Sequence, residues 1–249
     1  MIIKEIKDKI NILSNINKLT NTMSMISMSK MNKIFSYLII LENLFLESKK
    51  IYSALKIKKK KNNCIIIITS NKGLCGNLNN EILKKSLNFL KNNICKVFLI
   101  GKKSIDFFLK KNINFEEKII FKENEKISNI FFSKNILKKI KNKNIIFISS
   151  KFKNNIEILK TDLNQEKKKF FFEIFKFNKN FFIEKFINYS LKNFFIENFF
   201  CELKSRMITM KSASDNSKKI VKNMKIIKNK IRQFKVTQEM LEIINGCNL

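Results

Sequence analysis

Residues 3–26 read IKEIKDKINILSNINKLTNTMSMI, a stretch in which a large apolar side chain recurs every three or four positions. The pattern resumes after a five-residue step at Met31 and continues to Phe45, and residues 1–57 contain neither Gly nor Pro. An apolar stripe of this period without a helix breaker predicts one amphipathic helix of about 80 Å. The predicted stripe comprises Ile3, Ile6, Ile10, Leu13, Ile16, Leu19, Met23, Ile26, Met31, Ile34, Leu38, Leu41 and Phe45.

The carboxy-terminal part of the chain has the same periodicity, which predicts a second long helix from near Asn180 to Gly246. Neither helix can bury its stripe alone, and both leave the same intervening segment, so we expect them to pair as a long antiparallel coiled coil. The second predicted stripe comprises Leu203, Met207, Met210, Ile220, Met224, Ile227, Ile231, Phe234 and Leu241. Small polar residues interrupt the two stripes at Ser27, Ser29, Ser212, Ser214 and Ser217.

The middle of the chain alternates short apolar runs with helical stretches. The runs predicted as strands are Cys64–Thr69, Lys96–Ile100 and Asn144–Ser149. Helices are expected up to Asn92, after Gly101 and near 126–141, and residues 156–176 are expected to add edge strands. This alternation predicts an inserted α/β domain that is Rossmann-like, with a mostly parallel sheet. We therefore divide the chain into a helix over 1–60, an α/β domain over 61–178 and a helix over 179–249.

The composition is dominated by four residue types whose codons are rich in A and T. Lys, Asn, Ile and Phe account for 152 of the 249 residues, and the formal net charge is +31. This bias indicates a reduced genome under AT mutational pressure. Much of the positive charge is therefore explained by nucleotide composition, without a function that requires it.

The absent residue types exclude several chemistries. The chain has no His, so it contains no imidazole base, no Ser-His-Asp or Cys-His arrangement and no His-ligated metal. Its five Cys form no CxxC pair, and we expect free, reduced thiols in an intracellular protein. The charged amino terminus does not resemble a signal peptide, and no apolar run reaches the ~18 residues of a membrane span.

The loop over residues 70–78 lies between a predicted strand and a predicted helix, where a phosphate-binding loop would lie. It has no G-K-[ST] ending, and Gly73 and Gly76 do not form GxGxxG. We expect these two glycines to serve a tight turn with positive φ. Nucleotide binding, as in a small α/β nucleotide enzyme, is the alternative.

Three other features have competing interpretations. The positive charge permits a basic coiled coil that coats nucleic acid, but the lysines are spread along the chain and only two residues are Arg. The Phe-rich stretch 170–200 is interpreted as core, with a membrane-surface helix as the alternative. The methionines form either helix core or an adaptable binding surface: Met23, Met25, Met28 and Met31.

Several motifs lie in the two terminal helices and in one glycine-containing loop. The motifs are Lys4–Ile10, Lys18–Thr20, Met23–Met25, Ser29–Met31, Gly73–Asn79, Arg206–Asn216, Asn229–Gln233 and Thr237–Ile243. Through these motifs the chain resembles the gamma subunit of the F-type, rotary, proton-translocating ATP synthase, and the resemblance covers essentially the whole chain.

The resemblance implies a central rotary stalk with no catalytic residue, cofactor or metal of its own. Its partners would be three alpha and three beta subunits around one gamma, an epsilon subunit and the membrane c-ring, with no nucleic acid. The chain would lie peripherally on the cytoplasmic face of the bacterial inner membrane. The residues implied to contact the alpha/beta hexamer are Met23, Arg206, Gln233, Thr237 and Glu239, and the foot-domain loop contributes Lys72, Gly73 and Gly76.

Overall fold

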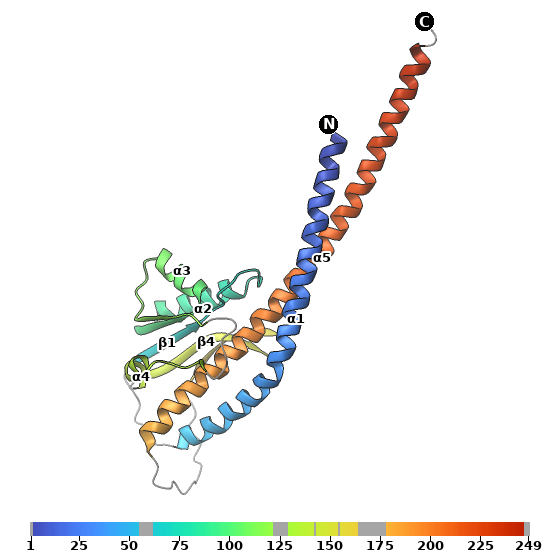
Figure 1. The fold of residues 1–249 in the computed structure, drawn as a ribbon. Helices are drawn as coiled ribbons and strands as arrows, with labels where there is room; N and C mark the ends of the chain where they lie inside the picture. Colours follow the sequence, from blue (N-terminus) through green and yellow to red (C-terminus); the bar gives the residue numbers. More distant parts are fainter. Residues whose placement is uncertain are drawn as a thin grey trace. The chain divides into compact units, whose positions relative to one another are not determined.

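The computed structural model describes residues 2–54, 62–121, 129–141, 143–153, 155–163 and 178–246. The chain divides into two compact units: Met1–Met28 with Arg206–Leu249 form unit 1, and Ser29–Ser205 form unit 2. Two long helices, α1 (Ile2–Ala54) and α5 (Lys179–Gly246), contribute residues to both units (Figure 1). These bounds confirm the two predicted terminal helices.

Unit 1 is an antiparallel pair of helices. The Asn17 side-chain amide of α1 donates to the backbone carbonyl of Ser214 in α5 at 2.9 Å, and the Ser24 hydroxyl donates to the carbonyl of Met207 at 3.2 Å. Moving from Asn17 to Ser24 along α1 thus corresponds to moving from Ser214 back to Met207 along α5. The predicted antiparallel pairing is confirmed.

The side chains between these helices are only partly the ones that the apolar stripe predicted: Met210 is buried as predicted, and Leu13 and Met23 are half-buried. Small polar residues are buried in unit 1, namely Ser24, Ser27, Ser214 and Ser217. Several predicted stripe residues are exposed instead, as Leu19 is to 63%, and the same holds for Ile16, Ile26, Ile220, Ile227, Phe234 and Leu241. Large side chains would hold the helices too far apart for Asn17 and Ser24 to reach the opposite backbone. The closest part of the contact therefore follows the small residues, and the exposed members of the predicted stripe lie on the surface.

Unit 2 contains a five-stranded sheet with the strand order β3-β2-β1-β4-β5. β1, β2, β3 and β4 are mutually parallel, and β5 pairs antiparallel with β4 at the edge. This order with a parallel core is the Rossmann-like arrangement that was predicted. The strands are β1 (Asn63–Ile68), β2 (Cys95–Ile100), β3 (Glu117–Ile119), β4 (Asn144–Phe152) and β5 (Ile156–Asp162).

Both faces of the sheet are buried. Ile66 lies in register between Phe98 of β2 and Phe147 of β4, and all three belong to one apolar cluster with α4 (Lys134–Lys141) and the unit-2 parts of α1 and α5. The alternating residues Ile65 and Ile67 face a second cluster with α2 (Leu78–Lys91) and α3 (Lys102–Lys110). Helices thus cover both sides of the sheet (Figure 1), which explains why the strand sequences are continuously apolar.

Phenylalanine supplies much of the core on the α1 and α5 side. The Phe147 and Phe194 rings stack at 4.6 Å between centroids, and Tyr52 stacks on Phe186 at 4.3 Å. The buried rings of Phe186, Phe194 and Phe200 confirm the core interpretation for much of the described part of the Phe-rich stretch, although Phe181 is 60% exposed. Residues 170–177 lie outside the described residues. Within the described ranges, none of the helices combines the length and apolar content needed to cross a bilayer.

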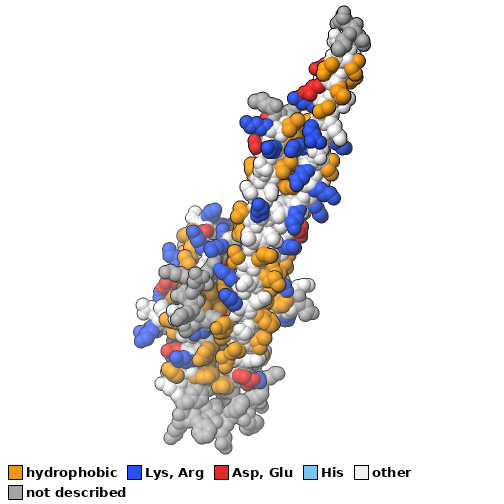
Figure 2. Space-filling view, turned by 45° about the vertical axis from the view of Figure 1, so that its right-hand side comes forward, with side chains coloured by type: hydrophobic (Ala, Val, Ile, Leu, Met, Phe, Trp, Pro, Cys, Tyr) orange, Lys and Arg blue, Asp and Glu red, His pale blue; other side chains and the backbone are white. Residues whose placement is uncertain are grey.

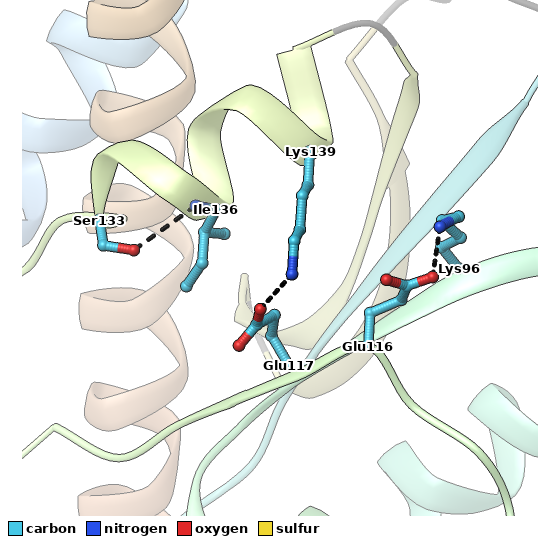
Figure 3. Close-up of polar contacts among 6 residues, drawn as sticks. All are labelled: Lys96, Glu116, Glu117, Ser133, Ile136 and Lys139. Atoms are coloured by element: carbon cyan, nitrogen blue, oxygen red, sulfur yellow. Dashed lines mark hydrogen bonds and ion pairs between the residues drawn. The ribbon is translucent and has the colours of Figure 1, made fainter.

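Helix α4 is shorter than predicted. Its first residue is Lys134, and residues 129–133 are not α-helical, while 122–128 lie outside the described residues. Ser133 sets this start as an N-cap, because its Oγ accepts a hydrogen bond from the Ile136 backbone N–H at 3.5 Å (Figure 3). Lys139 then reaches Glu117 of β3, the edge strand that the sequence did not predict.

Candidate functional site

The carboxy-terminal end of α5 is exposed along its whole described length. Every residue over 232–246 is exposed, and this segment extends past the amino-terminal end of its partner α1 in unit 1 (Figure 1). It carries three of the five residues predicted as hexamer contacts, Gln233, Thr237 and Glu239. The Thr237 hydroxyl donates to the Gln233 carbonyl at 2.9 Å, and Lys235 lies 3.5 Å from Glu239. Both interactions lie within the helix, so these side chains remain accessible to a partner.

The same end of α5 presents large apolar side chains to solvent. Phe234 is 72% exposed, and the exposed set comprises Ile226, Ile227, Phe234, Val236, Met240, Leu241, Ile243 and Ile244. In Figure 2 the upper helical part shows apolar side chains between lysines on the face in view. An exposed apolar surface of this length, rimmed by charges, marks an interaction site.

The other two predicted contacts lie at one level of the helix pair. Met23 and Arg206 immediately precede Ser24 and Met207, whose hydrogen bond links the two helices. Met23 is half-buried, whereas Arg206 is only 8% exposed. The structure therefore places the five predicted contacts in two groups along unit 1. One group is Met23 and Arg206, and the other is Gln233, Thr237 and Glu239.

A basic groove lies beside the Asn17–Ser214 contact. Its volume is about 400 Å³, and it is lined by Ser14, Asn17, Lys18, Lys218, Val221, Lys222 and Lys225. Four of the seven lining side chains are lysines, and none is acidic. Sequence reasoning did not single out this groove, because its lysines come from two helices and become neighbours only through their pairing.

The loop after β1 is held by its own hydrogen bonds. Asn79 accepts from the Ser70 backbone N–H at 3.1 Å and donates to the Ser70 hydroxyl at 2.8 Å, and Ser70 Oγ donates to the Lys72 carbonyl at 2.6 Å. Lys72 is exposed, so of the predicted foot residues it is the one with a charged side chain presented to solvent.

The backbone of this loop corrects one expectation. Gly76 has the predicted positive φ of 61°, but Gly73 does not, and Leu74 adopts φ 64° instead. The glycine that the fold requires most clearly lies at the end of β2. Gly101 has φ 98°, and a Cβ there would stand 2.1 Å from the Thr69 carbonyl oxygen. The sequence predicted that Gly101 ends a strand, but it did not predict the close approach of the Gly101 backbone to the Thr69 carbonyl oxygen.

The polar groups of the loop after β1 are not arranged to bind a phosphate. The Ser70 N–H and the Asn71 side chain are engaged within the protein, and Asn71 donates to the Phe121 carbonyl at 2.7 Å. Glu81 lies in the first turn of α2, where its negative charge opposes an anion at the helix amino terminus. The residues described by the structure contain no group of three or more His, Cys, Asp or Glu side chains placed to hold a metal ion.

The described cysteines are free thiols, as expected. Cys64, Cys75 and Cys201 are buried and Cys95 is half-buried, while Cys247 lies outside the described residues. Burial raises the pKa of both Cys64 and Cys201 to about 12, so these thiols stay protonated at neutral pH. Neither is activated as a nucleophile.

Two long antiparallel helices, an inserted doubly wound α/β domain and an exposed apolar helix end define the class of fold to which the chain belongs. A family model described as "ATP synthase" matches residues 2–248, and an ATP synthase gamma chain from Buchnera aphidicola subsp. Schlechtendalia chinensis is 33% identical over 288 residues. That alignment covers 98% of this chain and 97% of the relative. The chain belongs to the family of ATP synthase gamma chains.

A second gamma chain and two solved structures are also similar to this chain. The gamma chain of B. aphidicola subsp. Acyrthosiphon pisum (strain Tuc7) is 32% identical over 283 residues, covering 98% of this chain and 97% of the relative. A chain of the Euglena gracilis mitochondrial ATP synthase OSCP/F1/c-ring structure has a TM-score of 0.75 at 15% identity, covering 99% of this chain and 93% of that one. A chain of the Tetrahymena thermophila central stalk/c-ring structure has a TM-score of 0.62 at 21% identity, covering 79% and 99%. At these identities the structural likeness shows the fold.

Proposed function

We propose that this chain is the non-catalytic central shaft of a proton-translocating ATP synthase. Unit 1 inserts into a hexamer of three alpha and three beta subunits, and the α/β domain of unit 2 binds the epsilon subunit and the membrane c-ring. Proton flow turns the ring and the shaft together. The complex then lies on the cytoplasmic face of the bacterial inner membrane, with this chain attached peripherally.

The observation that carries the proposal is the exposed end of α5. A helix of this kind that packs against no partner is marginal in water, because most helical stability in proteins comes from packing an apolar face. Here the residues over 232–246 are exposed and include six of the large apolar side chains named above. A surrounding ring of subunits would cover these side chains on every side of the helix, which a single flat partner could not do.

The polar residues of unit 1 then have distinct roles. Gln233, Thr237 and Glu239 are accessible and would bind the inner loops of the hexamer. Met23 is half-buried and would meet a beta subunit at its exposed edge. Arg206, which the family resemblance implied as a hexamer contact, is only 8% exposed, and we propose that it fixes the helix pair at that level instead. The lysines of the basic groove would complement an acidic segment of a beta subunit and raise the rate of encounter.

The shaft acts by binding differently to each conformer of the catalytic subunits. Only such a difference in binding free energy can shift their populations between open and closed states. An asymmetric helix pair provides it, because each orientation presents a different set of side chains to a given subunit. ATP chemistry would belong to the beta subunits, which accounts for a chain without a histidine or a P-loop.

Reconstitution with alpha and beta subunits at moderate salt tests the proposal. We expect one copy of the chain per hexamer and ATPase activity that requires the complete complex, with no activity in the isolated chain. Binding to duplex DNA, measured at the same salt, is the control for a surface that binds any polyanion. No stoichiometric complex with competent subunits, together with tight DNA binding, would favour the nucleic-acid alternative.

A further inference from the structure

Glu197 is a carboxylic acid buried between a helix and the sheet of unit 2. Its side chain is 6% exposed, and its Oε1 lies 3.3 Å from the ammonium of Lys151 in β4. The same ammonium lies 2.9 Å from Oε1 of Glu42 in α1. One lysine therefore serves two carboxyl groups, which come from two different helices.

The hydrogen bonding of this group of three is incomplete. Glu197 Oε2 is buried, and no hydrogen-bond partner reaches it among the described residues. With both carboxyl groups ionised, the cluster would carry a net negative charge, part of it on an oxygen shielded from water. A buried charge without full hydrogen bonding is strongly unfavourable. Addition of one proton to Glu197 removes this charge and leaves Glu42 and Lys151 as a balanced ion pair.

We propose that Glu197 is a proton-binding site of the folded chain, and that release of its proton loosens the packing of α5 against β4 and α1. The proposal rests on this geometry and is independent of the function proposed above.

The surroundings of Glu197 support this assignment. Among the described residues, the titratable groups that face it are Glu42 from α1, Lys151 from β4 and Cys201 from its own helix. Burial raises the pKa of Glu197 to about 7; Lys151 opposes this and Glu42 reinforces it. Burial lowers the pKa of Lys151, but the two carboxylates outweigh it and the net pKa is raised, so the ammonium stays charged. Cys201 stays neutral because burial raises its pKa to about 12.

The position of Glu197 explains why its proton would affect packing. The next residue, Asn198, accepts a hydrogen bond from the Ser150 hydroxyl at 2.8 Å, and Ser150 precedes Lys151 in β4. Two neighbouring side chains of α5 thus contact two neighbouring residues of β4. Loss of the Glu197 proton would leave a negative charge at one of these contacts, and this charge would favour entry of water beside the other.

The direct test is a titration of the full chain labelled with ¹³C at glutamate carboxyl carbons and followed by NMR. Glu197→Gln identifies the signal, because it removes one resonance. We expect a midpoint near pH 7 for Glu197, against about 4.3 for an ordinary glutamate. A midpoint below about 5 would overturn the proposal. If Glu197→Gln does not fold, Glu42→Gln assigns the signal instead, because removal of this carboxylate should lower the midpoint of Glu197 alone.

Unfolding as a function of pH tests the structural consequence. Because the folded chain retains the proton to a higher pH than the unfolded chain, its unfolding constant should rise by up to about tenfold per pH unit between about pH 5 and pH 7. This rise should vanish in Glu197→Gln and persist in Glu184→Gln, a control on the same helix whose carboxylate pairs with Lys141 at 2.9 Å. Identical pH profiles for the wild type and Glu197→Gln would show that the proton does not affect packing.

Discussion

Asn17 and Ser214 lie 197 positions apart in the sequence, yet the Asn17 side-chain amide donates a 2.9 Å hydrogen bond to the Ser214 backbone carbonyl. A side chain that reaches the backbone of the opposite helix requires a close approach of the two helices. The fully buried Ser214 side chain permits it, because the hydroxymethyl group is small. Small polar residues therefore set the register of the helix pair at this level, and exposed apolar residues such as Leu19 and Ile26 remain available for partners.

Enlarging the side chain at this contact should separate the helices. Ser214→Leu is expected to lower the free energy of unfolding by about 1–3 kcal/mol, the usual cost of overpacking a well-packed site. Denaturant unfolding of the full chain measures the loss. Ser212→Leu, on an exposed position of the same helix, is the matched control and should change stability by less than about 0.5 kcal/mol. Equal losses in the two variants would contradict the role of the small residue.

Gly101 should tolerate no side chain. Its φ of 98° and the 2.1 Å distance from a built Cβ to the Thr69 carbonyl oxygen make Gly101→Ala strained in two ways. We expect a loss of about 3 kcal/mol or more in the free energy of unfolding. Gly73→Ala is the control, because its nearest neighbour would be the Lys103 side chain at 4.0 Å. A neutral Gly101→Ala variant would mean that the β2 end relaxes without cost.

Replacing Gln233 and Thr237 with alanine should separate folding from assembly. Both side chains are exposed, and the Thr237 hydroxyl donates to the backbone carbonyl of Gln233 within the same helix, so stability should change by less than about 0.5 kcal/mol. The affinity for the alpha/beta hexamer or the ATP turnover of the complex should fall by about tenfold, equivalent to ~1.4 kcal/mol. Lys230→Ala, also exposed on α5, controls for loss of any surface side chain. Unchanged assembly and turnover would reduce both positions to solvated helix surface.

Phe234→Ser tests the apolar end of α5. Because this ring is 72% exposed in the isolated chain, its removal should leave the unfolding midpoint almost unchanged. In the complex the same ring would be covered, so binding should weaken by about 2 kcal/mol. Titration of labelled hexamer with the wild-type chain and with Phe234→Ser measures the difference in binding free energy. Equal affinities would show that the ring remains in water after assembly.

Lys151→Met should destabilise unit 2 in a pH-dependent way. The substitution leaves Glu42 and Glu197 without their shared ammonium, and breaking such a pair costs about 2–3 kcal/mol for a side chain that retains 25% exposure. The loss should be larger at pH 8 than at pH 5, because Glu197, whose folded pKa is raised to about 7, is neutral at the lower pH. Lys141→Met removes the partner of Glu184, whose side chain is 45% exposed, so this variant should lose less stability than Lys151→Met. A loss independent of pH would argue that Glu197 is ionised throughout.

The long helices and central strands were predictable because their signals are local and extended. Apolar residues that recur with a helical period over tens of residues predict a long helix, and short apolar runs such as Ile65–Ile68 predict a buried strand. Neither prediction requires knowledge of which elements pack together. β3 spans only Glu117–Ile119 and is defined by its pairing with β2, so no local sequence pattern predicts it. The predicted start of α4 was wrong because the prediction did not use Ser133 as an N-cap, although its hydrogen bond with the Ile136 N–H is local.

The contacts between elements were less predictable than the elements themselves. The stripe predicted Leu19 and Ile26 between the helices, whereas Ser24 and Ser27 lie there, because periodicity fixes the face of a helix only to within a residue or two. The exposed site residues on α5 came from the family resemblance, and the basic groove required two helices to be paired first. The Glu42–Lys151–Glu197 cluster joins three elements, so sequence spacing alone does not indicate it.

Rotation of this chain inside the hexamer is the most direct test of the proposed shaft. Leu109, 54% exposed on α3, can be changed to cysteine to attach a bead, after confirming that the other thiols do not label. With the alpha and beta subunits fixed to a surface, we expect the bead to turn in one direction when ATP is added and to stop when ATP is removed. A complex that contains the chain and hydrolyses ATP while the bead stays still would contradict the rotary account.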